Sequence, residues 1–129
     1  MSAIVVDTHI IVWYFLNSKQ LSLQASEAID LAQTVYVPSI SLVELIYLVE
    51  KGKLPQIALD RLIQALDQAE THWAVVPLDT NVAQTIARIP RGTIPDMPDR
   101  IIAATALYLK VPLVTCDRKI LAADIPTIW

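Results

Sequence analysis

The stretch AIVVDTHIIVWYF, from Ala3 to Phe15, contains an unexpected charge. Nearly every side chain in it is apolar, yet Asp7 lies in its middle. A charged carboxylate is costly to bury unless it is hydrogen-bonded, paired or bound to a metal. The β-branched residues at 3–6 predict a strand that ends at Asp7, and residues 9–16 predict a helix after it. Other acids at the ends of strands would explain why a carboxylate is tolerated there.

Short β-branched runs alternate with longer amphipathic runs along the whole chain. Strands are predicted at 3–6, 35–37, 73–77, 112–115 and 126–129, and helices at 9–16, 23–33, 41–50, 55–69, 82–89, 98–109 and 119–122. This alternation predicts an α/β fold in which helices cover both faces of a parallel sheet. Because the chain has 129 residues and no linker-like segment, we expect a single domain over 1–129.

Composition narrows the class of protein. Hydrophobic residues make up 54% of the chain, but no apolar run approaches the roughly 18 residues of a membrane span. The start lacks the basic region and cleavage site of a signal peptide, so we expect a cytoplasmic protein without a membrane segment. The single cysteine, Cys116, excludes an internal disulfide and a cysteine-rich metal site. The net charge of −3 argues against general nucleic-acid binding, although the basic residues in 88–129 could form a local phosphate-binding rim.

Five acidic residues lie where predicted strands end or where the next helices begin. Asp7 and Asp117 end strands, and Glu44 lies in the first turn of a helix. Asp96 and Asp99 flank the start of the helix at 98–109. In a parallel α/β sheet, the carboxyl ends of the strands and the starts of the following helices share one edge, where ligands bind. The predicted fold therefore brings these carboxylates to one rim.

Each acid also has a purely structural explanation. Ser41 and Glu44 fit a capping box, in which the glutamate accepts a backbone N–H. Asp96 and Asp99 could favour the positive end of a helix dipole, and Asp117 could cap the helix after it. Their coincidence at one edge nevertheless favours a shared role. Clustered carboxylates raise one another's pKa or require a cation, and all-oxygen ligands favour Mg²⁺ or Mn²⁺, the usual ions of phosphoryl transfer.

Four segments follow one another in the order VVDTHIIVW, PSISLVEL, DMPDRIIAATAL and PLVTCDRKI. Together they resemble the PIN domain family, and in particular the VapC-type toxins of bacterial toxin–antitoxin pairs, over essentially the whole chain. The resemblance implies an α/β/α sandwich around a central parallel sheet of about five short strands. It implies an endoribonuclease that depends on Mg²⁺ or Mn²⁺ and hydrolyses RNA phosphodiester bonds. It also implies a homodimer and a cognate antitoxin protein as partner.

The resemblance also implies roles for single residues. Catalytic and metal-binding carboxylates are expected at Asp7, Glu44, Asp99 and Asp117. Residues that support these carboxylates are expected at Asp96, Thr115 and Thr8. The basic residues beside them are candidates for RNA or phosphate contacts, namely Arg100, Arg118 and Lys119. For Arg100, pairing with a neighbouring acid is the alternative and is the one we favour.

The aromatic residues of the opening stretch have two interpretations. Trp13, Tyr14 and Phe15 could stack on RNA bases. Packing in the core or against a second copy is the stronger expectation for so apolar a helix. His9 could approach the acids, but a packing role is again favoured.

Two other functions remain open from the sequence. One is a receiver-type phospho-acceptor signalling module, which also has acids at strand ends but needs a pair of acids early in the chain. The other is a catalytically silent protein of the PIN fold, which would use the acidic pocket only to bind a basic peptide. Metal binding without RNA cleavage would favour the silent protein.

Overall fold

The computed structural model describes residues 2–129. At its centre lies a five-stranded parallel sheet with the strand order β3-β2-β1-β4-β5. The strands are β1 (Ala3–Val6), β2 (Thr34–Pro38), β3 (Trp73–Val76), β4 (Leu113–Val114) and β5 (Thr127–Ile128). The predicted parallel sheet of about five short strands is thus confirmed, with the first strand in the middle.

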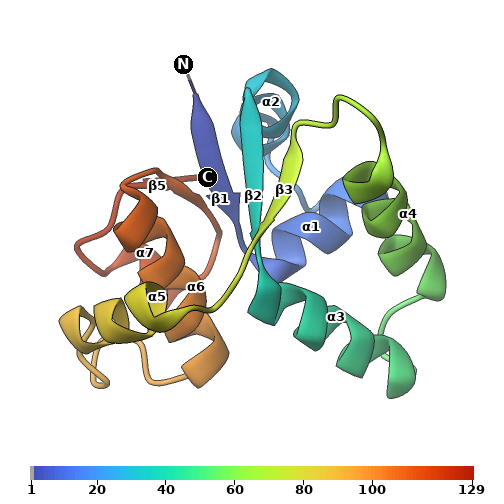
Figure 1. Cartoon of the computed structure of the whole chain (residues 1–129). Coiled ribbons are helices and arrows are strands. Elements are labelled where there is room, and N and C mark those ends of the chain that lie inside the picture. Colours follow the sequence, from blue (N-terminus) through green and yellow to red (C-terminus); the bar gives the residue numbers. More distant parts are fainter. Residues whose placement is uncertain (1) are drawn as a thin grey trace.

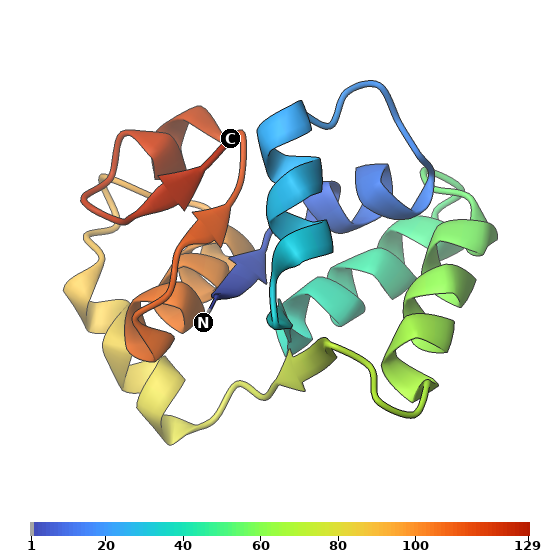
Figure 2. The same cartoon turned by 90° about the horizontal axis from the view of Figure 1, so that it is seen from above.

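Helices cover both faces of this sheet (Figure 1). One layer consists of α1 (Thr8–Phe15), α2 (Leu23–Leu31), α3 (Ser39–Glu50) and α4 (Gln56–Asp67). The other consists of α5 (Thr80–Thr85), the 3₁₀ helix η1 (Ile86–Arg88), α6 (Met97–Leu109) and α7 (Arg118–Leu121). Figure 2 shows the two groups of helices on either side of the strands. No helix within residues 2–129 has the length and apolar character needed to cross a bilayer.

The strand β1 shows how an unbroken apolar run serves both layers. Ile4 and Val6 belong to the buried cluster under α1 to α4, whereas Val5 belongs to the cluster under α5 to α7. Successive side chains of a strand point to opposite faces, so a strand covered on both sides has no polar positions. Complete burial of a side chain such as Val5 contributes about 1.5–3 kcal/mol of stability.

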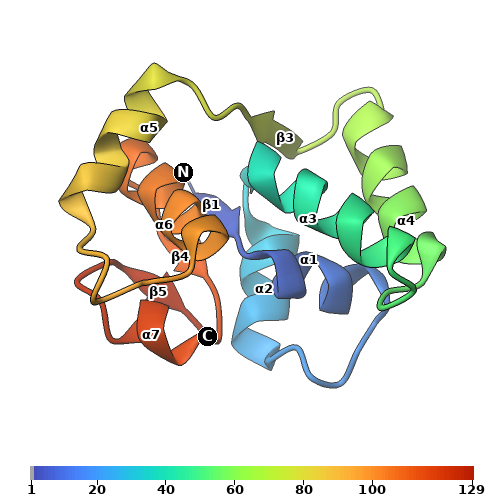
Figure 3. The same ribbon diagram turned by 90° about the horizontal axis from the view of Figure 1, so that it is seen from below.

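The carboxyl ends of the parallel strands share one edge, as predicted. Asp7 directly follows β1 and is the N-cap of α1. Asp117 follows β4 and is the N-cap of α7. Figure 3 is seen from this edge and shows α1, α3 and α6 converging around the end of β1. The helices α1 and α6 both contact α3, so three helices position side chains at this edge.

Several predicted boundaries differ from the structure. The helix predicted at 41–50 begins at Ser39, because Pro38 is its N-cap, and Glu44 therefore lies in the second turn rather than the first. The helix predicted at 82–89 begins at Thr80 and continues into η1. The side chain of Asp79 accepts a hydrogen bond from the Val82 N–H at 2.9 Å, which starts that helix two residues earlier than expected.

Candidate active site

Asp7 is held in place by hydrogen bonds to both of its carboxylate oxygens. Its side chain is only 7% exposed. The Thr115 hydroxyl donates to Oδ2 at 2.7 Å, and the Thr8 backbone N–H donates to Oδ1 at 2.7 Å. Burial raises the pKa of Asp7, and these two hydrogen bonds lower it only in part. The carboxylate is therefore fixed in position, but its negative charge remains unfavourable there.

Glu44 is directed toward Asp7 by the same threonine. The Thr8 hydroxyl donates to Glu44 Oε1 at 2.7 Å and lies 3.1 Å from the Ser41 hydroxyl. The predicted capping box is wrong, because Ser41 lies inside α3 and the Pro38 cap makes no side-chain hydrogen bond. Burial raises the pKa of Glu44, the bond from Thr8 lowers it, and the neighbouring carboxylates of Asp7 and Asp96 raise it further.

Asp99 is the carboxylate most affected by its neighbours. It lies half-buried in the first turn of α6, and its backbone N–H donates to Oδ2 of the N-cap Asp96 at 3.1 Å. Burial raises the pKa of Asp99 to about 7, with repulsion from other carboxylates adding to the shift. The repelling groups, strongest first, are Asp7, Asp96, Asp117 and Glu44. All five predicted acids are thus close enough to interact.

Asp117 is linked to Asp7 through one hydroxyl. The Asp117 backbone N–H donates to Thr115 Oγ1 at 3.0 Å, and the Thr115 hydroxyl in turn donates to Asp7. The Asp117 side chain accepts hydrogen bonds from the backbone N–H groups of Lys119 and Ile120, so its predicted capping role is also present. Asp117 therefore caps α7 and also lies at the acidic rim.

Three of these acids open into one small cavity of about 220 Å³. Its lining residues are Asp7, Asp99, Asp117, His9, Ile10, Trp13 and Cys116. Glu44 interacts with these carboxylates electrostatically but does not line the cavity. The cavity thus combines an acidic wall with an aromatic one.

The chemistry of these side chains suits a hard divalent cation. Several carboxylates meet without paired cysteines, and their mutual repulsion is the kind that Mg²⁺ or Mn²⁺ relieves. Within residues 2–129, however, no three His, Cys, Asp or Glu side chains are already spaced to hold a metal ion.

The three basic candidates have different positions. Arg118 and Lys119 are exposed at the start of α7, directly after Asp117, where they remain available to a phosphate. Arg100 is 8% exposed, and its Nη2 donates to the backbone carbonyls of Ile86 at 3.1 Å and Ile89 at 2.8 Å. The predicted phosphate contact of Arg100 is therefore wrong, and so is its pairing with an acid, because the guanidinium ties α6 to η1.

The structure adds an aromatic group beside the acids that the sequence did not favour. Trp13 lines the acidic cavity, and it also packs against the buried cluster under α1 to α4, as the favoured interpretation expects. Its ring centroid lies 6.0 Å from that of His9 and 6.0 Å from that of Trp129. The four-residue spacing of His9 and Trp13 on one helix was the available sequence signal.

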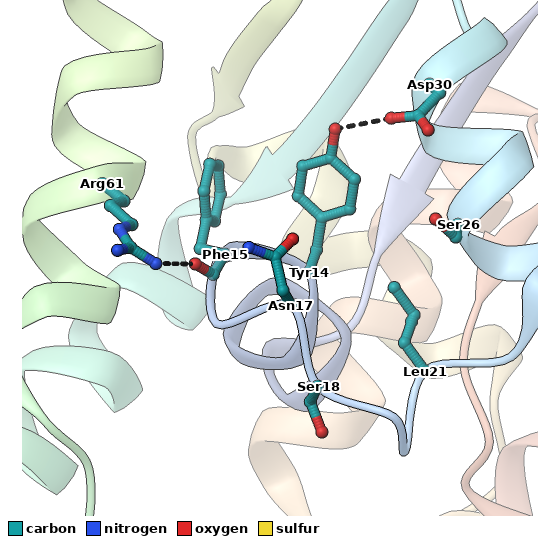
Figure 4. A pocket seen from close by; sticks show the side chains of 8 residues that line it. All are labelled: Tyr14, Phe15, Asn17, Ser18, Leu21, Ser26, Asp30 and Arg61. Atoms are coloured by element: carbon teal, nitrogen blue, oxygen red, sulfur yellow. Dashed lines mark hydrogen bonds between the residues drawn. The ribbon is translucent and has the colours of Figure 1, made fainter.

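A larger cavity of about 490 Å³ lies at the other end of α1 (Figure 4). Within it, the Tyr14 hydroxyl donates to Asp30 at 2.6 Å, and Arg61 donates to the Phe15 carbonyl at 2.6 Å. Its lining residues are Tyr14, Phe15, Asn17, Ser18, Leu21, Ser26, Asp30 and Arg61. None of the predicted metal-binding acids lines it, so its size alone does not make it the reaction site.

Comparison with known proteins places the chain among well-defined relatives. Residues 4–126 match the PIN domain family. Ribonuclease VapC22 from Mycobacterium tuberculosis (strain ATCC 25618 / H37Rv) is 33% identical over 132 aligned residues, covering 100% of both chains.

Solved structures show the same fold. VapBC2 from Rickettsia felis, bound to a promoter DNA fragment, matches with a TM-score of 0.73 and 19% identity, covering 97% of this chain and 96% of that one. The DNA-bound VapBC from Salmonella typhimurium matches with a TM-score of 0.72 and 24% identity, covering 98% and 97%. At these identities the likeness establishes the architecture.

Proposed function

Since the chain belongs to the PIN domain family, we propose that it is an endoribonuclease that hydrolyses RNA phosphodiester bonds as the toxin of a toxin–antitoxin pair. The observation that carries this proposal is the convergence of five carboxylates on one rim, where Asp99 has its pKa raised to about 7. The full-length relative named as a ribonuclease supports the same activity. The match to the PIN domain family also argues against the receiver-type signalling module.

We propose that Asp7, Glu44, Asp99 and Asp117 hold Mg²⁺ or Mn²⁺. When bound, such an ion supplies an activated water and offsets the charge of a phosphate under attack. The chain's own residues orient the four carboxylates. Thr115 fixes Asp7 and the Asp117 backbone, Thr8 fixes Asp7 and Glu44, and Asp96 fixes the start of α6 that carries Asp99. The N-termini of α1 and α6 add positive dipole ends that favour a phosphate at the same edge.

A covalent cysteine mechanism does not suit the cavity. Cys116 lines it, but burial raises the pKa of the thiol, and repulsion from Asp7 and Asp117 raises it further. The nucleophilic form of cysteine is the thiolate, which this environment disfavours. Hydrolysis by water at the acidic rim is therefore the reaction type that the site supports best.

We further propose an antitoxin protein and a second copy of the chain as partners. Solved structures with this fold include toxin–antitoxin complexes. Several large apolar side chains are exposed on the described surface, including Val43, Ile46 and Tyr47 on α3. Such a surface is typical of a protein that buries part of itself against a partner.

The direct test is cleavage of a mixed-sequence RNA by the purified chain in Mg²⁺, in Mn²⁺ and in EDTA. We expect cleavage with either ion, none in EDTA, and loss of cleavage in Asp99→Asn. The matched control is Asp79→Asn, which changes an acid that caps α5 and is not among the carboxylates that raise the pKa of Asp99, so activity per folded molecule should be unchanged. Metal binding without any RNA cleavage would instead favour the silent binding protein.

A further inference from the structure

Three aromatic rings continue the acidic rim away from the carboxylates. His9 and Trp13 are four residues apart on α1, so they share one face of that helix. Both line the cavity that contains Asp7, Asp99 and Asp117. Trp129 directly follows β5 and therefore lies at the same carboxyl edge of the sheet. The rings form a row in the order His9, Trp13, Trp129.

The row is not simply part of the core. Trp13 and Trp129 are both partly exposed and pack against the buried cluster from its margin, whereas Trp73 is only 6% exposed. The planes of Trp13 and Trp129 are inclined by 49° at a centroid distance of 6.0 Å. Rings in this arrangement do not cover each other's faces, so a flat ligand can still stack on them.

The neighbours of Trp13 determine what kind of ligand fits. A purely apolar partner would have to dehydrate the adjacent carboxylates of Asp7, Asp99 and Asp117, which is costly. A nucleotide offers two different parts, a flat base for the ring and an anionic phosphate for a cation held by the acids. Base stacking on aromatic side chains tolerates any sequence, but it requires a base that is not enclosed in a duplex.

We propose that Trp13, with His9 and Trp129 beside it, forms a stacking platform for an unpaired base next to the cleaved phosphate. This inference rests on the proposed ribonuclease function. It assigns to Trp13 substrate binding rather than chemistry. Loss of the ring should therefore act on KM far more than on kcat.

The first test measures cleavage of single-stranded RNA and of the same sequence in a duplex, with wild type, Trp13→Leu and Trp13→Phe. We expect the single strand to be preferred by wild type, and Trp13→Leu to raise KM about five- to 100-fold. Trp13→Phe keeps a ring and should restore most of the affinity. The control is Tyr108→Leu, which removes an exposed ring at the far end of α6, away from the acids. Equal KM values for wild type and a folded Trp13→Leu would overturn the proposal.

Two further measurements complement the Trp13 variants, because the first uses only the wild-type protein and the second does not require turnover. After the cleaved bond has been mapped, wild-type protein is given the same RNA with an abasic nucleotide beside that bond. We expect slower cleavage from a higher KM, and an unchanged KM would overturn the platform. Tryptophan emission of the Asp99→Asn chain is also titrated with RNA in Mg²⁺, and we expect quenching that Trp13→Phe reduces.

The results separate the two proposals. If wild type cleaves RNA and Trp13→Leu has the same KM, the ribonuclease proposal stands and the stacking platform is ruled out. If wild type does not cleave RNA but RNA still quenches its emission through Trp13, the nuclease proposal is ruled out and base binding stands. An inactive wild type without quenching removes both.

Discussion

Asp7 is buried because the chain supplies hydrogen bonds to both of its carboxylate oxygens. Thr115 and Thr8 donate these bonds from a strand end and a helix start that are 107 positions apart in the chain. The bonds do not fully offset burial, because the pKa of Asp7 remains raised. The carboxylate is thus positioned at the expense of stability, as is typical of residues kept for function.

Replacement of Asp7 by asparagine separates position from charge. The amide oxygen can still accept from the Thr8 N–H, and asparagine is as good an N-cap as aspartate. We expect the metal-free melting temperature at pH 8 to hold or rise, because an unfavourable charge is removed. RNA cleavage should fall by more than the roughly 10–100-fold that is typical when a residue only supports a metal ligand.

Melting in EDTA and cleavage of a mixed RNA are measured side by side for wild type and Asp7→Asn. A clearly destabilised variant that still cleaves at nearly the wild-type rate per folded molecule would show that Asp7 is structural.

Thr115 provides a second test at a single side chain. It is fully buried, donates to Asp7 and accepts from the Asp117 N–H. Thr115→Val keeps the shape but leaves that N–H without its partner, which should cost about 1–3 kcal/mol in urea unfolding. Activity should fall about 10–100-fold, because Asp7 loses its orientation. Thr115→Ser restores the hydroxyl and should recover most of both losses; failure of serine to do so would argue against the hydrogen bond as the cause.

Among the elements, the ends of β1 and β4 and the starts of α3 and α6 together deliver the acids. The strand pattern was sufficient to predict this convergence, because acids at strand ends meet once the sheet is parallel. Helix starts were harder to predict. The N-cap of α3 is Pro38, which has no side-chain hydrogen bond, whereas the capping box of Ser41 and Glu44 would place the N-cap three residues too late.

Contacts between distant segments escaped the sequence for a physical reason. The partners of Arg100 are backbone carbonyls of Ile86 and Ile89, and carbonyl groups are common to every residue, so nothing in the sequence marks them. The same applies to Trp129, whose position beside Trp13 depends on β5 joining the sheet next to β4. The residue types alone were enough to predict which acids meet at the sheet edge. The orientation of Arg100 and Trp129 could be found only from how the helices and strands pack.

The pH dependence of stability follows from the crowded acids at these element ends. The pKa of Asp99 is about 7 in the folded chain and near 3.8 when unfolded. Between these values the folded state binds more protons than the unfolded state, so the free energy of unfolding falls as pH rises. In EDTA we expect the melting temperature to decrease from pH 5.5 to pH 8, and millimolar Mg²⁺ to reduce this decrease by relieving the repulsion.

The control for this pH effect is Asp99→Asn, which should show a flatter profile in EDTA. A wild-type melting temperature that rises across the same window would contradict the proposed repulsion.

For the whole molecule, the two helical layers leave an apolar strip on α3. Val43, Ile46 and Tyr47 are 59%, 45% and 55% exposed and recur at a spacing of three to four residues, which places them on one helix face. We predict that this strip contributes to a homodimer. Light scattering should give a dimer mass for wild type and a monomer mass for Ile46→Glu.

Leu31→Glu on α2 changes another exposed apolar residue and serves as the control, with a dimer mass expected. A monomeric wild type would remove the dimer without affecting the nuclease proposal.

The central claim is that the acids of the rim bind the divalent cation on which RNA cleavage depends. Titration of the metal-free chain with Mn²⁺, with free Mn²⁺ followed by electron paramagnetic resonance, tests this most directly. We predict that wild type and Asp79→Asn bind Mn²⁺ with the same affinity and that Asp7→Asn loses this binding. Binding by Asp7→Asn that equals that of wild type, or no binding by wild type in the millimolar range, would contradict the claim.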